Sequence, residues 1–216
     1  MAKTNKVEKH NHIKNHFKSV DPVIHRAMQN IDFDEWFNPR EKRKTKLGYF
    51  SALCREIIGQ QLAGKAAQAI IDRFINLFEG KRVTPEKVLA FEDGVLREVG
   101  MSWAKVKYLK DLSQKTIRDE VELEKLYELP DEAVVYELTK VKGIGPWTAE
   151  MLLIFSLGRE DVFSFGDLGL RRGIEYLYEI KSPTEAKIKK IVDVWTPYKT
   201  YGSIALWHSL DTKVVK

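Results

Sequence analysis

Between two predicted helices lies the sequence Leu138-Thr139-Lys140-Val141-Lys142-Gly143-Ile144-Gly145-Pro146-Trp147-Thr148-Ala149. Gly143 and Gly145 permit positive φ angles and a close approach of the backbone to another molecule. Pro146 suits a first helical turn, where its missing N–H has no intrahelical partner. Ile144, between the two glycines, is expected to point into the core. The pattern predicts two helices joined by a tight Gly-x-Gly hairpin.

Such a hairpin also offers an anion site, because backbone N–H groups and a helix start point outward together. In DNA the matching anion is a backbone phosphate, a contact that fixes position without reading sequence. The Gly-x-Gly element alone is not specific. It has neither the preceding strand of a dinucleotide-binding turn nor the Gly-Lys-Ser/Thr of a phosphate-binding loop. A purely structural turn between helices is the alternative.

The rest of the chain is patterned for helices. Apolar residues recur at three- and four-residue steps within 47–62, 66–78, 106–117, 133–141, 148–157, 168–180 and 188–195. Convincing strand alternation is absent, and glycines and prolines separate the periodic segments. The sequence therefore predicts an all-α protein of about ten helices with short connections. Residues 1–18 are expected to be a disordered or peripheral tail, with metal binding by its histidines as the alternative.

Composition narrows the function less than the hairpin does. Lys and Arg total 36 against 31 acidic residues, a net charge of +5 that suits a nucleic-acid partner and an ordinary solvated surface equally. The single cysteine, Cys54, excludes an internal disulfide and a thiolate zinc or iron–sulfur site. No secretion signal is present at the N-terminus, and the longest apolar run, 151–157, is too short to span a bilayer. These features predict an intracellular protein without a membrane partner.

One aspartate after the hairpin lies in Asp161-Val162-Phe163-Ser164-Phe165-Gly166-Asp167-Leu168-Gly169-Leu170. From the residues alone, Asp167 is best explained as the N-cap of a helix over 168–178. A carboxylate in a partly apolar setting also acts strongly on a nearby positive charge. Capping and catalysis are compatible roles for the same side chain.

Taken together, the hairpin and the following Gly166-Asp167-Leu168-Gly169 resemble the helix–hairpin–helix glycosylase superfamily. The segments 57–67, 100–109 and 195–207 resemble further motifs of its DNA-3-methyladenine glycosylase II branch, the alkylpurine DNA glycosylases. These motifs occur in the family's order and cover roughly residues 20–210. The resemblance implies the helix–hairpin–helix DNA glycosylase fold, with two helical subdomains and an active-site cleft between them. It places the glycosylase domain at 19–216, a central subdomain at about 60–155, and a second subdomain in the N- and C-terminal helices. It also implies the short form, without an N-terminal β domain.

The resemblance implies a reaction as well. Asp167 matches the catalytic carboxylate, which stabilises an oxocarbenium-like sugar or orients the attacking water. Asp161 is the rival, although its place in the family is usually structural. Trp147 stands where strand-cutting relatives hold a lysine that forms a Schiff base. The chain is therefore expected to be a monofunctional hydrolase in base excision repair that removes 3-methyladenine and 7-methylguanine and leaves an abasic site. The alternatives are a bifunctional glycosylase/lyase for oxidised bases and a non-catalytic DNA-binding module.

Family positions also suggest where the flipped base and the DNA would lie. Trp147, Met151 and Trp207 match the base pocket, whereas core packing is the alternative for each tryptophan and the better explanation for Trp103 and Tyr198. Gln61 or Leu62 matches the wedge that fills the gap in the duplex, with a plain helix connector as the alternative. Met151, Lys199 and Ala63 depart from the usual family residues, which leaves the substrate range open.

The remaining expectations concern binding. The predicted DNA-binding residues are Gly143, Ile144, Gly145, Thr148, Lys65 and Lys105. No cofactor is expected, apart from a structural monovalent cation held by the backbone carbonyls of Thr139, Val141 and Ile144. The expected partner is double-stranded DNA with alkylated bases, bound by a monomer in a bacterial-type cytoplasm or a nucleus.

Overall fold

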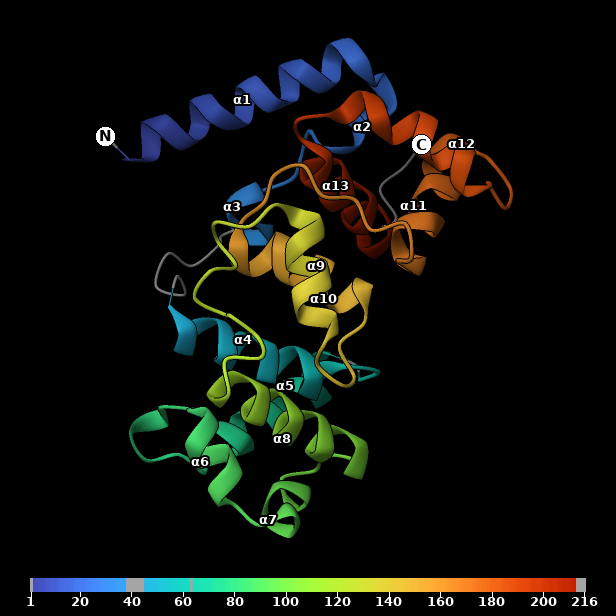
Figure 1. Cartoon of the computed structure of the whole chain (residues 1–216). Coiled ribbons are helices and arrows are strands. Elements are labelled where there is room, and N and C mark those ends of the chain that lie inside the picture. Colours follow the sequence, from blue (N-terminus) through green and yellow to red (C-terminus); the bar gives the residue numbers. More distant parts are fainter. Residues whose placement is uncertain (1, 38–44, 63, 213–216) are drawn as a thin grey trace. The chain divides into compact units, whose positions relative to one another are not determined.

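The structure is a computed structural model that describes residues 2–37, 45–62 and 64–212. Every regular element in these ranges is helical, which confirms the predicted all-α class (Figure 1). None of the described helices combines the length and apolar character needed to cross a bilayer. The chain divides into two compact units. One comprises Arg40–Leu157, and the other comprises Met1–Pro39 together with Gly158–Lys216.

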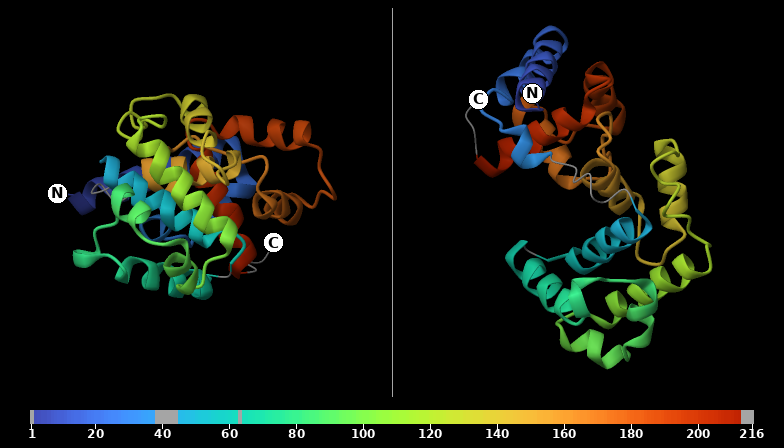
Figure 2. Two further views of the ribbon diagram at one scale, coloured as in Figure 1. Left: turned by 60° about the horizontal axis from the view of Figure 1, so that its bottom comes forward. Right: turned by 90° about the vertical axis from the view of Figure 1, so that its left-hand side faces the viewer.

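The unit Arg40–Leu157 contains α4 (Lys46–Gly59), α5 (Gly64–Asn76), η2 (Glu79–Lys81), α6 (Pro85–Ala90), α7 (Asp93–Glu98), α8 (Trp103–Ile117), α9 (Asp131–Thr139), α10 (Pro146–Leu152) and the π-helical turn η3 (Leu153–Leu157). Helix α8 packs on α4, α6 and α7. It buries Val106, Leu109 and Leu112 completely, so the apolar spacing of its sequence becomes the core face. Figure 2 shows α4, α6, α7 and α8, coloured cyan to yellow-green, from two further directions.

Lysines of α8 hold the ends of neighbouring helices. Lys105 Nζ lies 2.8 Å from the carbonyl oxygen of Ile58 near the end of α4. Lys110 donates in the same way to Leu89 at the end of α6, and Lys115 donates to the carbonyl of Lys140, which caps α9. An ammonium group at a helix C-terminus satisfies orphan carbonyls and opposes the negative end of the helix dipole.

The unit formed by the two chain ends contains α1 (Ala2–Val20), α2 (Pro22–Ala27), α3 (Phe33–Trp36), α11 (Leu168–Tyr178), α12 (Glu185–Val192), η4 (Asp193–Trp195) and α13 (Lys199–Thr212). Helix α13 is its centre: residues 200–206 are all buried, and the helix packs on α2 and α11. Gly173 of α11 allows a close crossing, because a Cβ there would lie 2.7 Å from Cβ of Leu206.

Helix α1 differs from the disordered or peripheral tail expected for residues 1–18. Ile13 and Phe17 are completely buried, and the Phe17 ring centroid lies 6.0 Å from that of Trp195. Part of the apolar cover comes from Trp195, far along the chain, and the polar local sequence does not indicate it. The compact unit that begins at Arg40 likewise includes α4, which the expected boundary near residue 60 left out.

A buried carboxylate joins the N-terminal segment to the C-terminal one. Asp21 Oδ1 accepts hydrogen bonds from the backbone N–H groups of Val23 and Ile24 and so caps α2. Its Oδ2 accepts from Trp195 Nε1 at 2.8 Å and from the Tyr178 hydroxyl. Burial, followed by the charge of Asp21, raises the pKa of Tyr178 far above its ordinary value. A carboxylate with this many donors is stabilised although it is only 7% exposed.

Candidate active site

Asp167 occupies the start of α11. Its backbone is extended, with φ −76° and ψ 119°, and its Oδ1 lies 2.7 Å from the backbone nitrogen of Leu170. This is the N-cap that the residues alone predict, and it is confirmed. The side chain is only 7% exposed, so the carboxylate lies in a largely dehydrated setting where a charge acts more strongly than in water.

Trp207 of α13 reaches the same carboxylate. Its indole Nε1 lies 3.2 Å from Oδ1 of Asp167. A Cβ on Gly169 would lie 3.0 Å from that oxygen and 3.1 Å from both Cδ1 and Nε1 of Trp207. Gly169 therefore leaves the clearance in which the indole and the carboxylate meet. The sequence predicted Trp207 in a base pocket. It did not indicate this hydrogen bond or the role of Gly169. The only sequence feature that marks Gly169 is its place two residues after Asp167 in the Gly-Asp-Leu-Gly motif.

Asp161, the rival carboxylate, has structural partners. Its Oδ1 lies 3.2 Å from the backbone nitrogen of Lys199, and its Oδ2 lies 3.6 Å from the Lys199 ammonium. Asp161 thus ties the connection before α11 to the start of α13. The ammonium of Lys199 makes this contact as a point charge.

The hairpin between α9 and α10 uses its two glycines differently. Gly143 has φ +81°, and a Cβ there would lie 2.1 Å from a ring carbon of Tyr108. Gly145, the N-cap of α10, has φ −94°, and a Cβ added to it would meet no atom within 4 Å. Of the two, only Gly143 needs the left-handed conformation that the sequence allowed for both. Ile144 is 4% exposed and points inward as predicted.

Gln60, at the end of α4, fastens the hairpin. Its Nε2 lies 2.8 Å from the carbonyl oxygen of Gly143 and 3.3 Å from Oγ1 of Thr148. The amide of Lys142 donates to Asp111 Oδ2 at 2.8 Å. Thr148, a predicted DNA contact, is only 4% exposed, so its side chain belongs to this internal network. The sequence does not single out Gln60, which lies within the segment 57–67 that resembles a family motif.

The connection between α4 and α5 carries the predicted wedge. Gln61 has φ +60°, and Leu62 is 37% exposed despite its apolar side chain. Ala63 lies outside the described residues. Lys105 supports this connection, with Nζ 2.7 Å from the carbonyl oxygen of Gln60.

The two predicted phosphate-binding lysines differ in their surroundings. Burial lowers the pKa of Lys105, and its ammonium donates to two helix-end carbonyls. This internal role differs from the phosphate contact expected of it. Lys65, near the start of α5, is exposed.

The remaining aromatic candidates are distributed unevenly. Trp147 is 42% exposed on α10, whereas Met151, one turn later, is buried. Trp103 is 55% exposed at the start of α8, so the prediction that it packs in the core is wrong. Tyr198 is half-buried with its ring centroid 5.2 Å from that of His16, as packing requires. Trp103 directly follows Ser102, the N-cap of α8, and its ring lies outside the core face that Val106 and Leu109 form.

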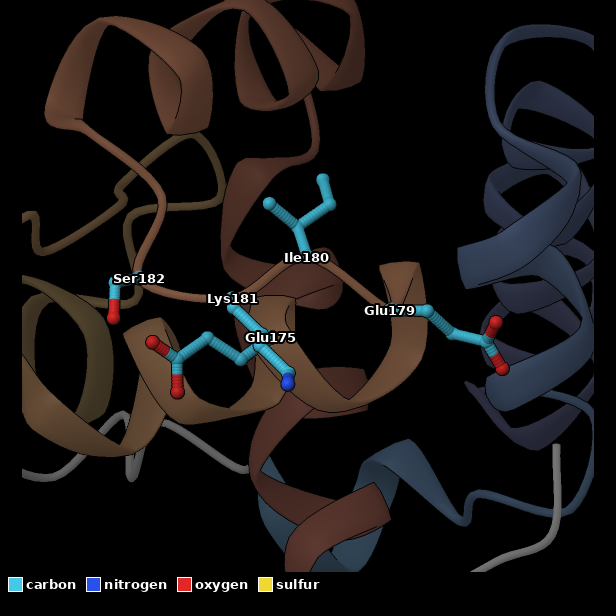
Figure 3. Close-up of a pocket in the computed structure, with 5 residues that line it drawn as sticks. All are labelled: Glu175, Glu179, Ile180, Lys181 and Ser182. Atoms are coloured by element: carbon cyan, nitrogen blue, oxygen red, sulfur yellow. The ribbon is translucent and has the colours of Figure 1, made fainter.

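An open cavity of about 440 Å³ lies at the end of α11, and none of its lining residues is a site residue predicted from the sequence. Its lining consists of Glu175, Glu179, Ile180, Lys181 and Ser182. In Figure 3 the carboxylates of Glu175 and Glu179 point in opposite directions, so they do not converge on one ligand.

Metal binding has limited support. Among the described residues, no group of three His, Cys, Asp or Glu side chains is arranged to hold a metal ion. The carbonyls of Thr139, Val141 and Ile144 are hard oxygen donors, which fit a monovalent cation in chemical type. The Val141 carbonyl already accepts the N–H of Ile144 at 3.1 Å. The cation site stays a prediction.

Comparison with known proteins covers the same segments. Residues 54–197 match the model for the HhH-GPD superfamily base excision DNA repair protein. DNA-3-methyladenine glycosylase 1 of Schizosaccharomyces pombe is 36% identical over 174 residues, covering 79% of this chain and 76% of that protein. A DNA-3-methyladenine glycosylase of Saccharomyces cerevisiae is 30% identical, covering 95% of this chain and 81% of that protein.

A solved structure shares the fold. The 3-methyladenine DNA glycosylase of Schizosaccharomyces pombe, in complex with abasic DNA, aligns with a TM-score of 0.76 and 32% identity. The alignment covers 94% of this chain and 99% of that one. The residues matched by the family model include the hairpin and Asp167, and the predicted family is confirmed. This chain belongs to the HhH-GPD superfamily of base excision DNA repair proteins.

Proposed function

We propose that this protein is a monofunctional DNA glycosylase that removes alkylated purines, 3-methyladenine and 7-methylguanine, from double-stranded DNA and leaves an abasic site. The observation that carries the proposal is the buried carboxylate of Asp167, held at the start of α11 by two N–H donors. Support comes from the family and from two relatives named as 3-methyladenine glycosylases, one of them solved with abasic DNA. The protein acts as a monomer.

The reaction suits a single carboxylate. Alkylation gives the purine a positive charge, so the bond between C1′ and the base nitrogen breaks with its electron pair passing to a neutral leaving base. Positive charge then develops on the sugar, and the negative Asp167 side chain stabilises it. Water forms the new bond to C1′ and loses a proton to the surroundings. No covalent enzyme intermediate is required.

Trp147 suits the base rather than the sugar. A half-exposed indole presents an electron-rich face, which attracts a cationic base more than a neutral one. The family resemblance implies a lysine at this position in the strand-cutting relatives, and the indole of Trp147 has no amine to form an imine. Met151, one turn further along α10, supplies apolar backing.

DNA contacts follow from exposure. Gly145 presents bare backbone at the start of α10, which suits a phosphate that approaches closely. Leu62, exposed beside the strained Gln61, is the residue we assign to the gap left by the flipped nucleotide. Lys65 adds an exposed positive charge near the same connection.

The first test is incubation with methylated DNA, with the released bases identified by mass. Asp167→Asn is expected to lose about 10²- to 10³-fold in the single-turnover rate, the range for removing one electrostatic contact to a transition state. Its affinity for DNA should stay within about threefold of that of the wild type. Asp161→Asn is the matched control, since it makes the same change in the same connection. A wild-type rate in Asp167→Asn defeats the catalytic assignment.

A second test separates the proposal from the two rival classes. With borohydride present, a glycosylase/lyase leaves a covalent protein–DNA adduct, because its imine is reduced. We expect no adduct and intact abasic strands. A trapped adduct contradicts monofunctional hydrolysis, and a wild-type protein that binds DNA but releases no base identifies a non-catalytic module.

A further inference from the structure

Two residues beside Asp167, Trp207 and Gly169, take no direct part in the proposed reaction. We infer that Trp207 and Gly169 are positioning residues: the indole N–H of Trp207 fixes the Asp167 carboxylate, and the bare Gly169 makes that contact possible. The inference rests on the proposed function, in which Asp167 acts on the sugar cation. It gives Trp207 a task distinct from stacking on the base.

The carboxylate is held from two helices. Oδ1 accepts the Leu170 N–H of α11 at 2.7 Å and the Trp207 indole N–H of α13 at 3.2 Å. A capping bond alone leaves the carboxylate plane free to adjust about its terminal torsion, which is broad for aspartate. A second donor on the same oxygen, from a different direction, restricts that rotation. Catalysis by a fixed charge depends on this kind of preorganisation.

A glycine at position 169 is unfavourable for helix stability, so its presence there needs a reason. Gly169 is the second residue of α11, and glycine is less favourable than alanine within helices. Its φ is not in the left-handed region, so the backbone conformation does not require glycine. The space is tight instead: a Cβ would lie 3.0 Å from Asp167 Oδ1 and 3.1 Å from Trp207 Nε1, so one of these side chains would have to move by a few tenths of an ångström. The missing side chain therefore preserves the contact between the carboxylate and the indole.

The same unit contains an internal comparison. Trp195 donates its indole N–H to the buried carboxylate of Asp21 at 2.8 Å, as Trp207 does to Asp167. Asp21 has a structural role, joining α2 to Tyr178 and Trp195. Removing the N–H of Trp195 should therefore cost stability alone, whereas removing that of Trp207 should cost rate.

The decisive measurement is the single-turnover rate on 7-methylguanine DNA at saturating enzyme, paired with the Kd for DNA that carries a tetrahydrofuran abasic analogue. Gly169→Ala should lower the rate about 10- to 100-fold, the range for disturbing a group that orients a catalytic one. The Kd should change by less than about twofold. Gly166→Ala is the control: it lies on the other side of Asp167, and its Cβ would meet nothing within 4 Å. It should keep the wild-type rate.

Trp207→Phe separates the N–H from the ring. Phenylalanine keeps an aromatic face for stacking but removes the donor, so a positioning role predicts a rate loss similar to that of Gly169→Ala with the Kd unchanged. Trp195→Phe should lower the Tm and leave the rate unchanged. Wild-type rates in both Gly169→Ala and Trp207→Phe overturn the inference. Rate losses that appear only as weaker DNA binding overturn it as well.

A spectroscopic measurement covers the case in which a variant folds poorly. The indole N–H of Trp207 gives one of five tryptophan side-chain signals in a ¹⁵N–¹H spectrum, and Trp207→Phe assigns it. In Asp167→Asn this signal should shift more than that of Trp195, because it loses a charged acceptor. No shift contradicts the hydrogen bond. An Asp167→Asn protein that keeps its rate overturns the proposed function, whereas an inactive Asp167→Asn beside fully active Gly169→Ala and Trp207→Phe proteins overturns this inference alone.

Discussion

The Nε2 atom of Gln60 lies 2.8 Å from the carbonyl oxygen of Gly143 and so links the end of α4 to the hairpin. The same amide reaches Thr148 Oγ1 at 3.3 Å, on the second helix of the hairpin. Through one side chain, the connection that carries Leu62 and the turn that carries Gly145 are held at a fixed spacing.

Gln60→Ala should weaken DNA binding about three- to tenfold, because the hairpin and the Leu62 connection would have to be ordered on binding. The free energy of unfolding should fall by about 1–2 kcal/mol, since the Gly143 carbonyl and the Thr148 hydroxyl lose a partner. Fluorescence anisotropy with labelled DNA and urea denaturation measure the two effects. Gln68→Ala, at a glutamine that bonds Asp72 on the surface, is the control. Unchanged affinity in Gln60→Ala contradicts the link.

The two hairpin glycines should respond differently to alanine. Gly143→Ala combines positive φ with a collision against Tyr108, so we expect a loss of about 2–4 kcal/mol in the free energy of unfolding. Gly145→Ala meets no atom of the chain, so its expected cost in stability is only that of alanine in place of glycine at an N-cap, below about 1 kcal/mol. Its added methyl group should weaken DNA binding by obstructing a phosphate. Denaturation and binding titrations on both variants check this, and wild-type affinity in Gly145→Ala removes it from the interface.

Replacing Lys65 and replacing Lys105 should have different effects on the salt dependence of DNA binding. Lys65→Ala removes an exposed charge and should reduce the slope of log Kobs against log salt by about 1. Lys105→Met removes an ammonium that already bonds two carbonyls, so the slope should stay the same. Stability should instead fall by about 1–2 kcal/mol as the carbonyls lose their donor. A reduced slope in Lys105→Met restores the phosphate contact predicted from sequence.

Cys54 provides a probe of unfolding and of pH dependence. Its side chain is 1% exposed, and burial raises the pKa of its thiol above the ordinary value. A thiol reagent at pH 8 should label the folded protein only as fast as the unit Arg40–Leu157 opens. Immediate labelling of the folded protein contradicts the burial.

The sign of the pH effect follows from that raised pKa. Folding favours the protonated thiol of Cys54. Its contribution to the free energy of unfolding is therefore complete below the pKa of the thiol in the unfolded chain, and it declines as the pH rises above about 8.5. Urea denaturation between about pH 8 and 9.5 should show this decline, and Cys54→Ala should reduce it. The pKa values of Tyr178 and Tyr201 are also raised, chiefly by burial, and their effect follows at higher pH.

Local features of the backbone could be predicted from short sequence patterns. The Gly-x-Gly turn with Ile144 inward and the N-cap role of Asp167 depend on contacts within a few residues, and the structure contains both. Sequence reasoning failed where the partner lies far along the chain. The sequence of α1 is mostly polar and gives no indication that Ile13 and Phe17 are buried. Phe17 packs in part against Trp195. Lys105 looks like any surface lysine until α4 ends beside it.

By itself, therefore, the sequence determined the helical class, the family, the hairpin and the aspartate that begins α11. The apolar periodicity, the placement of glycine and proline, and the short motifs depend on residues close together in the sequence. They therefore favour the same local structure whatever packs against it. Only the tertiary structure decided which groups serve Asp167. Trp207 meets it because α13 packs against α11, and Gly169 matters because a methyl group there would lie closer than ordinary contact to both side chains. Such contacts join residues far apart in the sequence, and close packing, rather than any local pattern, selects them.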